Sequence, residues 1–101
     1  MTNEEIIENG FKSQIDILEK LSLRKKEISK ITDLVFESVS TGGTIFFMGN
    51  GGSAAESQHI STEFVGRFLK DRKPIPAISL NVDSSAITAI SNDYKFENIF
   101  E

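Results

Sequence analysis

Two helical patterns open the chain. Between residues 4 and 39, apolar residues recur at steps of three and four, with charged residues between them. This period predicts two amphipathic helices, and the glycine pair Gly42–Gly43 supplies the left-handed residue that commonly ends a helix. Two such helices cannot bury both apolar stripes on each other, so we expect an antiparallel hairpin whose remaining stripe packs on a sheet or another subunit. The stripes consist of Ile6, Ile7, Phe11, Ile15, Leu18 and Leu21, and of Leu23, Ile28, Ile31, Leu34, Val35 and Val39.

The period changes after the glycine pair. The run TIFFM, Thr44–Met48, is continuously apolar and rich in residues that favour strands, which is typical of a strand buried on both faces of a parallel sheet. Gly49–Gly52 breaks this run. Ser53 is a good N-cap residue, and we expect a helix from there to about Phe68 or Leu69.

A second strand and a further helix follow. Ile75–Asn81 reads as a strand, and Asp83 or Ser84 can cap a helix over SAITAI that ends at residues 91–93. Strand, loop, helix, strand and helix in this order predict an α/β domain with a parallel sheet. The final stretch YKFENIFE begins another amphipathic element without a stop signal, so we expect this to be the front part of a longer domain.

The predicted organisation is therefore a helical hairpin over residues 1–42, suited to an oligomer interface, and the first part of a sheet domain over residues 43–101.

Charge and composition limit the partners. Fifteen acidic and eleven basic residues give a net charge of −4, so no overall positive field attracts nucleic acid or an anionic membrane. There is no cysteine, and the acidic start MTNEEIIENGF is unlike a signal peptide. We expect a soluble cytoplasmic protein that binds neither nucleic acid nor membrane.

The glycine loop is the first candidate for chemistry. A strand that leads through glycines into a helix gathers unpaired N–H groups at a positive helix end, where an anion is favoured. Ser53 can offer a hydroxyl to a phosphate, and Asn50 can hydrogen-bond a sugar hydroxyl. The loop has neither the lysine of a Walker A motif nor the spacing G-x-G-x-x-G, so a polyol phosphate suits it better than a nucleotide. A plain tight turn between strand and helix would use the same residues.

Three charged or titratable residues share one face of the helix after the loop. His59, Glu63 and Arg67 follow one another at four-residue steps. A histidine and a glutamate at this spacing can share a divalent metal, or the glutamate can act as a proton-transferring base. The alternative is a surface hydrogen bond, with Glu63 also paired to Arg67. Similarly, the basic run Arg67, Lys70, Arg72 and Lys73 suits a solvated helix end that complements the helix dipole.

These residues resemble a known family. GNGGSAAESQH, then STEFVGRF, then PAISLNVDSSAITAISND closely resemble the phosphoheptose isomerases, which have the sugar isomerase (SIS) fold. The resemblance spans the whole chain and implies an α/β/α sandwich of the flavodoxin-like type, of which this sequence would be the N-terminal half. It implies an aldose–ketose isomerase that interconverts sedoheptulose 7-phosphate and D-glycero-D-manno-heptose 7-phosphate in bacterial heptose synthesis, for lipopolysaccharide or capsule.

The resemblance also implies roles for individual residues. Glu63 matches the catalytic glutamate, and His59 with Glu63 matches two ligands of one zinc ion. The other zinc ligands, a second catalytic residue (a histidine in the family) and most of the phosphate-binding residues would lie outside this segment, so this segment alone should be inactive. The family is usually homotetrameric. With Arg67 added from the same helix face, the expected substrate-binding residues are Asn50, Gly51, Gly52, Ser53, Glu63, Arg67, Asn92 and Asp93.

Two non-catalytic functions remain open. One is a regulatory SIS protein of the replication-initiator-binding type, which resembles these isomerases but lacks the glutamate of this helix. The other is a module that binds a phosphosugar and regulates a partner, without turnover or metal dependence. Glu63 is the residue that favours an enzyme.

Overall fold

The structure is a computed structural model that describes residues 1–67 and 69–101, and the chain divides into two units, Met1–Leu34 and Val35–Glu101. The division between the two units falls between Leu34 and Val35, inside the second helix, and does not test the predicted domain boundary after residue 42. That boundary stays a prediction.

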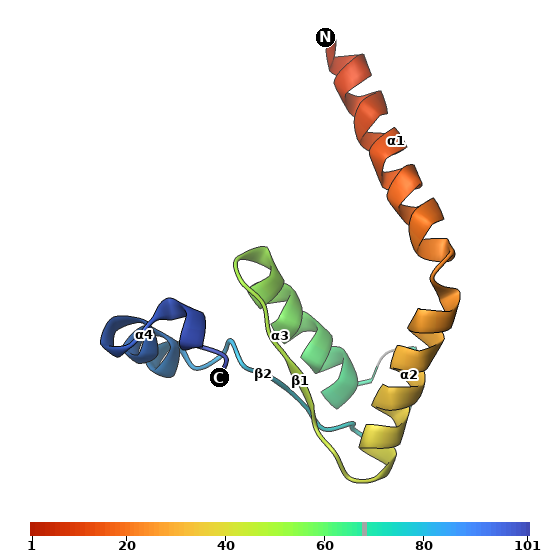
Figure 1. Cartoon of the computed structure of the whole chain (residues 1–101). Coiled ribbons are helices and arrows are strands. Elements are labelled where there is room, and N and C mark those ends of the chain that lie inside the picture. The colour runs from red at the N-terminus through yellow and green to blue at the C-terminus, as the bar shows by residue number, and fades with distance from the viewer. Residues whose placement is uncertain (68) are drawn as a thin grey trace. The chain divides into compact units, whose positions relative to one another are not determined.

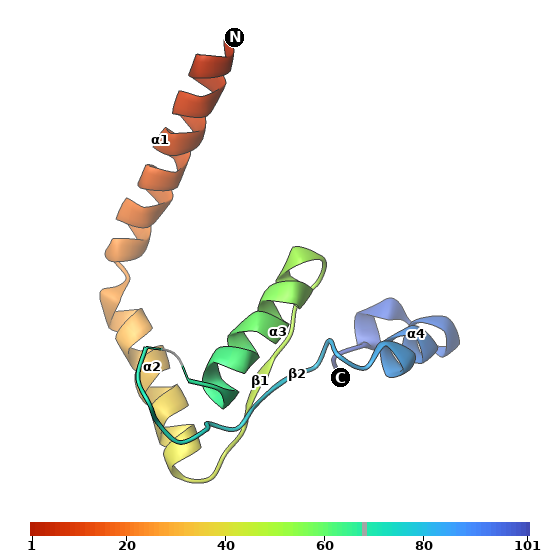
Figure 2. The same ribbon diagram turned by 180° about the vertical axis from the view of Figure 1, so that it is seen from behind.

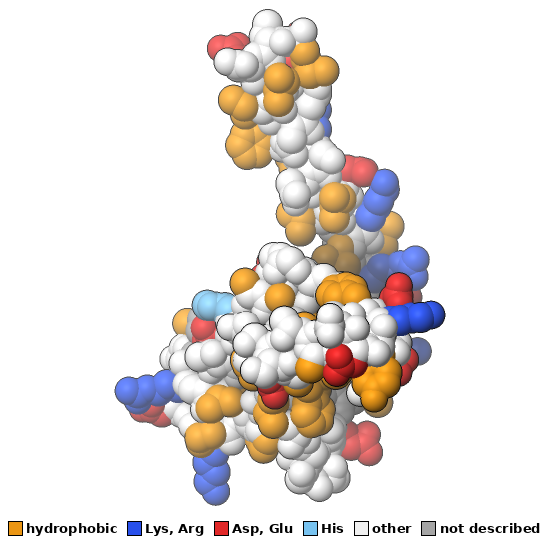
Figure 3. Space-filling view, turned by 90° about the vertical axis from the view of Figure 1, so that its left-hand side faces the viewer, with side chains coloured by type: hydrophobic (Ala, Val, Ile, Leu, Met, Phe, Trp, Pro, Cys, Tyr) orange, Lys and Arg blue, Asp and Glu red, His pale blue; other side chains and the backbone are white. Residues whose placement is uncertain are grey.

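The first unit contains helix α1 (Asn3–Ser22) and the first turns of helix α2 (Lys25–Ser40). A capping box starts α1: the Glu5 N–H donates to the Thr2 hydroxyl, and the Thr2 N–H donates to the Glu5 carboxylate at 2.6 Å. Every residue from 1 to 34 is exposed. Hydrophobic side chains accordingly lie on the surface of α1 (Figure 3), and the first predicted stripe is uncovered within the single chain. Of the second stripe, Val35 and Val39 are half-buried and the other residues are exposed.

The end of α2 follows the sequence prediction. Gly42 has φ +89°, and its N–H donates to the carbonyl of Val39 at 3.3 Å. The N–H of Gly43 reaches the carbonyl of Ser38 at 2.8 Å. These two bonds form a Schellman motif, which satisfies carbonyls that the helix end would otherwise leave without donors. The prediction that the glycine pair ends this helix is confirmed.

The second unit is built on two parallel strands and one helix. Strand β1 (Ile45–Phe47) pairs with strand β2 (Ala77–Ser79), with Ile45 opposite Ala77 and Phe47 opposite Ser79. Both strands are shorter than predicted. Helix α3 (Gly52–Val65) lies along both of them (Figures 1 and 2).

Small side chains let α3 approach the sheet closely. Ser57 and Ser61 on the helix are buried, as are Ala77 and Ser79 on β2. Phe47 and Phe64 pack beside them with ring centroids 5.5 Å apart. The opposite face carries Phe46, 53% exposed, and Ile78, 49% exposed. The prediction that the first strand is buried on both faces is therefore wrong for the single chain, because among the described elements α3 is the helix that packs on this two-stranded sheet, and it covers one face.

Helix α3 is shorter than the sequence pattern predicted. It ends at Val65, because the backbone of Gly66 is extended and its N–H closes the last turn onto the carbonyl of Thr62 at 2.8 Å. The predicted end at Leu69 is wrong, and the alternative end at Phe68 lies outside the described residues.

The last elements are helix α4 (Ser84–Asp93) and a 3₁₀ turn over Phe96–Asn98 that contacts it. Asp83 caps α4, as predicted, by accepting a hydrogen bond from the N–H of Ala86 at 2.9 Å. Among the described residues, none of the helices is long and apolar enough to cross a membrane.

Candidate functional site

The glycine loop lies where β1 ends and α3 begins. Gly51 is the N-cap of α3 and has φ +58°, a left-handed value that favours glycine. The prediction that Ser53 caps the helix is wrong, because no side chain makes the cap hydrogen bond. Ser53 instead lies in the first turn, and its N–H donates to the carbonyl of Asn50 at 3.0 Å. Its hydroxyl is therefore not occupied in capping.

Three successive backbone N–H groups follow the strand without an acceptor. Those of Asn50, Gly51 and Gly52 make no hydrogen bond within the described part of the chain. They lie at the positive end of α3, a helix of 14 residues. Donors of this kind, at the carboxyl end of a parallel strand, suit the oxygens of a phosphate.

Asn81 holds the start of this loop, and the sequence analysis did not identify it. Its side-chain oxygen accepts the N–H of Gly49 at 3.0 Å, and its side-chain nitrogen donates to the carbonyl of Gly49 at 2.8 Å. Only one orientation of the amide makes both bonds. The available signal was its place at the end of the second predicted strand, since the carboxyl ends of parallel strands meet at one edge.

Two buried serines extend this polar cluster. The Ser57 hydroxyl lies 2.8 Å from the hydroxyl of Ser79 and 3.1 Å from the side-chain oxygen of Asn81. The N–H of Asn81 points to the hydroxyl of Ser79 at 3.3 Å. The buried side-chain polar atoms of the described residues all have hydrogen-bond partners. The cluster of Ser57, Ser79 and Asn81 therefore leaves no buried polar atom without a partner, and it links α3, β2 and the loop.

His59 and Glu63 lie further along α3, as the sequence predicted. Their side chains meet, with the histidine Nε2 3.3 Å from the glutamate Oε1. The imidazole is 77% exposed and the carboxylate 35% exposed, so a ligand can reach both groups. At a rise of about 1.5 Å per residue, His59 and Glu63 lie about 10 and 16 Å from Gly52 along the helix axis.

The pair fits half of a zinc shell. Two ligand atoms at tetrahedral bonds of about 2.0–2.1 Å lie roughly 3.3 Å apart, which is the separation observed between Nε2 and Oε1. The same separation also suits a hydrogen bond. Within the described residues there is no cluster of three or more histidine, cysteine, aspartate or glutamate side chains around a metal position. His59 and Glu63 are therefore a candidate pair of metal donors and not a complete site.

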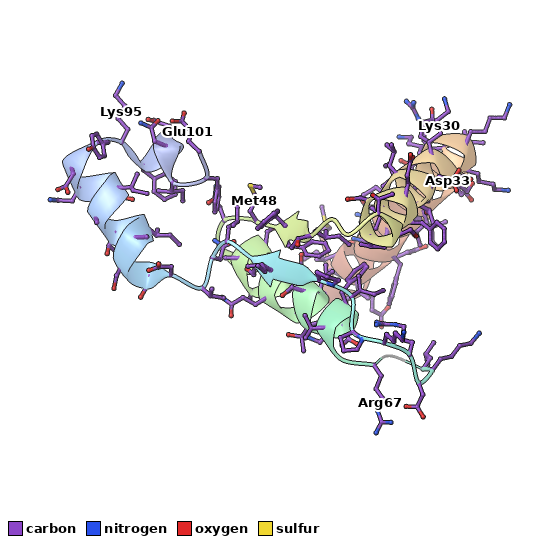
Figure 4. The ribbon with its side chains drawn as sticks, turned by 90° about the horizontal axis from the view of Figure 1, so that it is seen from below. Lys30, Asp33, Met48, Arg67, Lys95 and Glu101 are labelled. Carbon is purple, nitrogen blue, oxygen red and sulfur yellow. The ribbon has the colours of Figure 1, made fainter. Side chains whose placement is uncertain are left out.

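Arg67 does not join the glycine loop in the single chain. It pairs with Asp71 rather than with Glu63. The two ends of α3 lie beside opposite ends of β2. Near the start of α3, Ser57 contacts Ser79, the last residue of β2, whereas near its end the carbonyl of Phe64 accepts a hydrogen bond from the N–H of Ile75, which precedes β2. Figure 4 shows Met48, next to the loop, far from Arg67, whose side chain points away from the sheet. Its predicted substrate contact stays a prediction.

Arg72 stabilises the end of α3. Its guanidinium donates to the backbone carbonyls of Glu63 and Phe64, the latter at 2.9 Å. A cation at this position complements the negative end of the helix. For Arg72 the structure agrees with the simpler explanation of the basic run.

Asn92 and Asp93 form the end of α4, and both are exposed. The Asn92 side-chain nitrogen donates to the carboxylate of Asp93 at 3.1 Å. No hydrogen bond or ion pair in the described residues connects them to the glycine loop. Their predicted role in substrate binding stays a prediction.

Comparison with known proteins identifies the family. A family model for the SIS domain matches residues 11–101. The chain belongs to the SIS domain family.

Relatives and solved structures refine this assignment. The chain is 42% identical to "Phosphoheptose isomerase" of Helicobacter hepaticus over 95 residues, which cover 94% of this chain and 48% of that protein. It is 45% identical to the protein of the same name from Clostridium acetobutylicum, over 94% of this chain and 50% of that protein. This SIS chain therefore spans about half the length of the curated relatives it matches.

Two solved structures share the fold. A phosphoheptose isomerase from Francisella tularensis superposes with a TM-score of 0.88 at 32% identity, over 99% of this chain and 53% of that one. Phosphoheptose isomerase GmhA from Neisseria gonorrhoeae gives a TM-score of 0.84 at 32% identity, over 98% and 51%. The predicted α/β fold with a parallel sheet and the resemblance to phosphoheptose isomerases are confirmed.

Proposed function

We propose that the full-length protein is an aldose–ketose isomerase that interconverts sedoheptulose 7-phosphate and D-glycero-D-manno-heptose 7-phosphate. One observation carries the proposal: α3 begins in a loop with three unpaired N–H groups and brings His59 and Glu63 into contact further along the same helix. Relatives named phosphoheptose isomerase support the choice of substrate.

The loop and the helix would divide the chemistry between them. The N–H groups of Asn50, Gly51 and Gly52 bind the phosphate, and the hydroxyl of Ser53 lies beside them to take a further phosphate oxygen. Glu63 then removes the proton from one of the two carbons C1 and C2, while an acid from outside this segment protonates the carbonyl oxygen to give the enediol. Glu63 returns its proton to the other carbon, and the hydroxyl on that carbon gives its proton back to the acid and becomes the new carbonyl. Holding the phosphate restricts the motion of the sugar, which lowers the entropy cost of presenting a carbon to the base.

Zinc belongs to the same proposal. His59 and Glu63 would supply two of its ligands, and a bound zinc ion would stabilise the negative charge that develops on the enediolate oxygen. Arg67, Asn92 and Asp93 are proposed as further substrate contacts, made in the complete assembly.

We further propose that the protein is a cytoplasmic homotetramer that serves bacterial heptose synthesis, for lipopolysaccharide or capsule. The exposed apolar stripes of α1 and α2 support an assembly, because contiguous apolar surface of this kind is usually covered by a partner.

The test is turnover of sedoheptulose 7-phosphate by the full-length protein, with and without a chelator, beside Glu63→Gln. This variant keeps the size of the side chain and removes the base, so kcat should fall by at least about 100-fold. Glu56→Gln is the matched control, because it makes the same change on an exposed position of α3, and its kcat should be unchanged.

Unchanged turnover in Glu63→Gln would show that Glu63 is not the base. Binding of the sugar phosphate by the wild type, without any turnover, would favour the regulatory phosphosugar-binding function instead.

A further inference from the structure

The first residue of the glycine loop is held from two sides. On one side Asn81 pairs with both its N–H and its carbonyl. On the other side the first turn of α3 lies so close that a Cβ at Gly49 would be 2.6 Å from the Cβ and the carbonyl oxygen of Ser53. Gly49 therefore has little freedom to move, although the following residues Asn50 and Gly51 are exposed.

The side chain of Asn81 hydrogen-bonds the backbone just beyond the last bond between the two strands. The last bond between the strands runs from the N–H of Leu80 to the carbonyl of Phe47 at 2.9 Å. Beyond it β1 turns toward α3, and the amide of Asn81 pairs with Gly49 as a neighbouring peptide group would in a ladder. The Asn81 side chain thus extends the pairing of the strands to Gly49, which directly precedes the three unpaired N–H groups.

The amide is itself fixed. Its oxygen also lies 3.1 Å from the hydroxyl of the buried Ser57, which shares its single proton between Asn81 and the carbonyl of Ala54 at 2.7 Å and contacts the buried Ser79. A side chain with partners at both ends loses little additional freedom when a ligand binds, and a polar cluster without unsatisfied atoms adds rigidity.

From these contacts we propose that Asn81 is a positioning residue, which holds the N–H groups of Asn50, Gly51 and Gly52 in the arrangement that receives a phosphate. The inference rests on the proposed function for its substrate. Both ends of the Asn81 amide pair with Gly49, so we expect it to act on phosphate binding and not on proton transfer.

Asn81→Ala in the full-length protein tests this role. The loop amides lose their support before binding, so KM for sedoheptulose 7-phosphate should rise roughly ten-fold, a loss of about 1.4 kcal/mol of binding. The kcat should change less than about two-fold, because contacts made equally in the ground and transition states affect KM alone. A change that only impaired folding would reduce the active fraction and lower the apparent kcat. Asn9→Ala, on α1, is the matched control and should leave both constants unchanged.

A second probe separates this inference from the proposed function. Inorganic phosphate binding, measured by calorimetry, should weaken in Asn81→Ala by a factor similar to the rise in KM, and this holds even if the wild type turns over no heptose phosphate. Where Asn81→Ala fails to fold, Asn81→Ser replaces it, because one short hydroxyl cannot pair with both the N–H and the carbonyl of Gly49. An unchanged KM and an unchanged phosphate affinity in a folded variant would overturn the role of Asn81.

Discussion

Single residues in the glycine loop have different tasks, although the sequence shows them only as a run. Gly51 needs its positive φ, Gly49 lacks space for a side chain, and Gly52 has neither constraint, since an added Cβ would have no neighbouring atom within 4 Å. The structure divides them into one residue required by backbone conformation, one by packing and one that is unconstrained.

Gly49→Ala should therefore destabilise the full-length protein. Forcing a methyl group against the first turn of α3 is expected to lower the free energy of unfolding by about 2 kcal/mol, as overpacking commonly does. Urea unfolding at fixed protein concentration measures the change. Gly52→Ala is the control and should stay within about 0.5 kcal/mol of the wild type. Equal losses in the two variants would show that the close approach of Ser53 to Gly49 is not what makes glycine necessary.

At the scale of the elements, most local signals that act over three or four residues were reliable. The predicted cap at Asp83 and the glycine end of α2 are confirmed, whereas the predicted cap at Ser53 is wrong because Gly51 takes the N-cap position. The end of α3 was placed too late, because the apolar pattern continues past Gly66 while the backbone does not. The spacing of apolar residues predicts which face of a helix a residue would occupy, but it does not predict whether the helix extends as far as that residue.

Asp83→Ala should weaken α4 selectively. Loss of the bond to the N-terminal amide of Ala86 is expected to cost about 1 kcal/mol. Hydrogen exchange of the first amides of α4 is the measurement, and exchange should become faster there. Ser85→Ala removes a hydroxyl in the same turn without touching the cap, and should leave exchange unchanged. If the two variants behave alike, Asp83 does not stabilise this helix end.

At the scale of the whole molecule, the described chain leaves large apolar side chains exposed. Phe11 is 67% exposed in α1, and Phe46 is 53% exposed on the uncovered face of the sheet. Surface of this kind is normally covered in a finished assembly. The length of the relatives, about twice the matched segment, and the proposed homotetramer are both consistent with such cover.

The proposed assembly can be tested through α1. In the full-length protein, Phe11→Asp places a charge in the apolar stripe and should shift the protein to smaller species in sedimentation velocity, because a charge buried at an interface is strongly unfavourable. Asn9→Asp introduces the same charge at a polar position of the same helix and should sediment as the wild type does. An assembly that is unchanged in Phe11→Asp would exclude this stripe from the interface.

The sequence by itself determined the helices, the cap at Asp83, the two strands, the glycine loop and the pairing of His59 with Glu63, because each depends on residues only a few positions apart. Tertiary structure decided what surrounds them. It joined Asn81 to Gly49 and Ser57 to Ser79. These contacts depend on strand register and on the face of the sheet that α3 covers, and neither is encoded in the spacing of neighbouring residues.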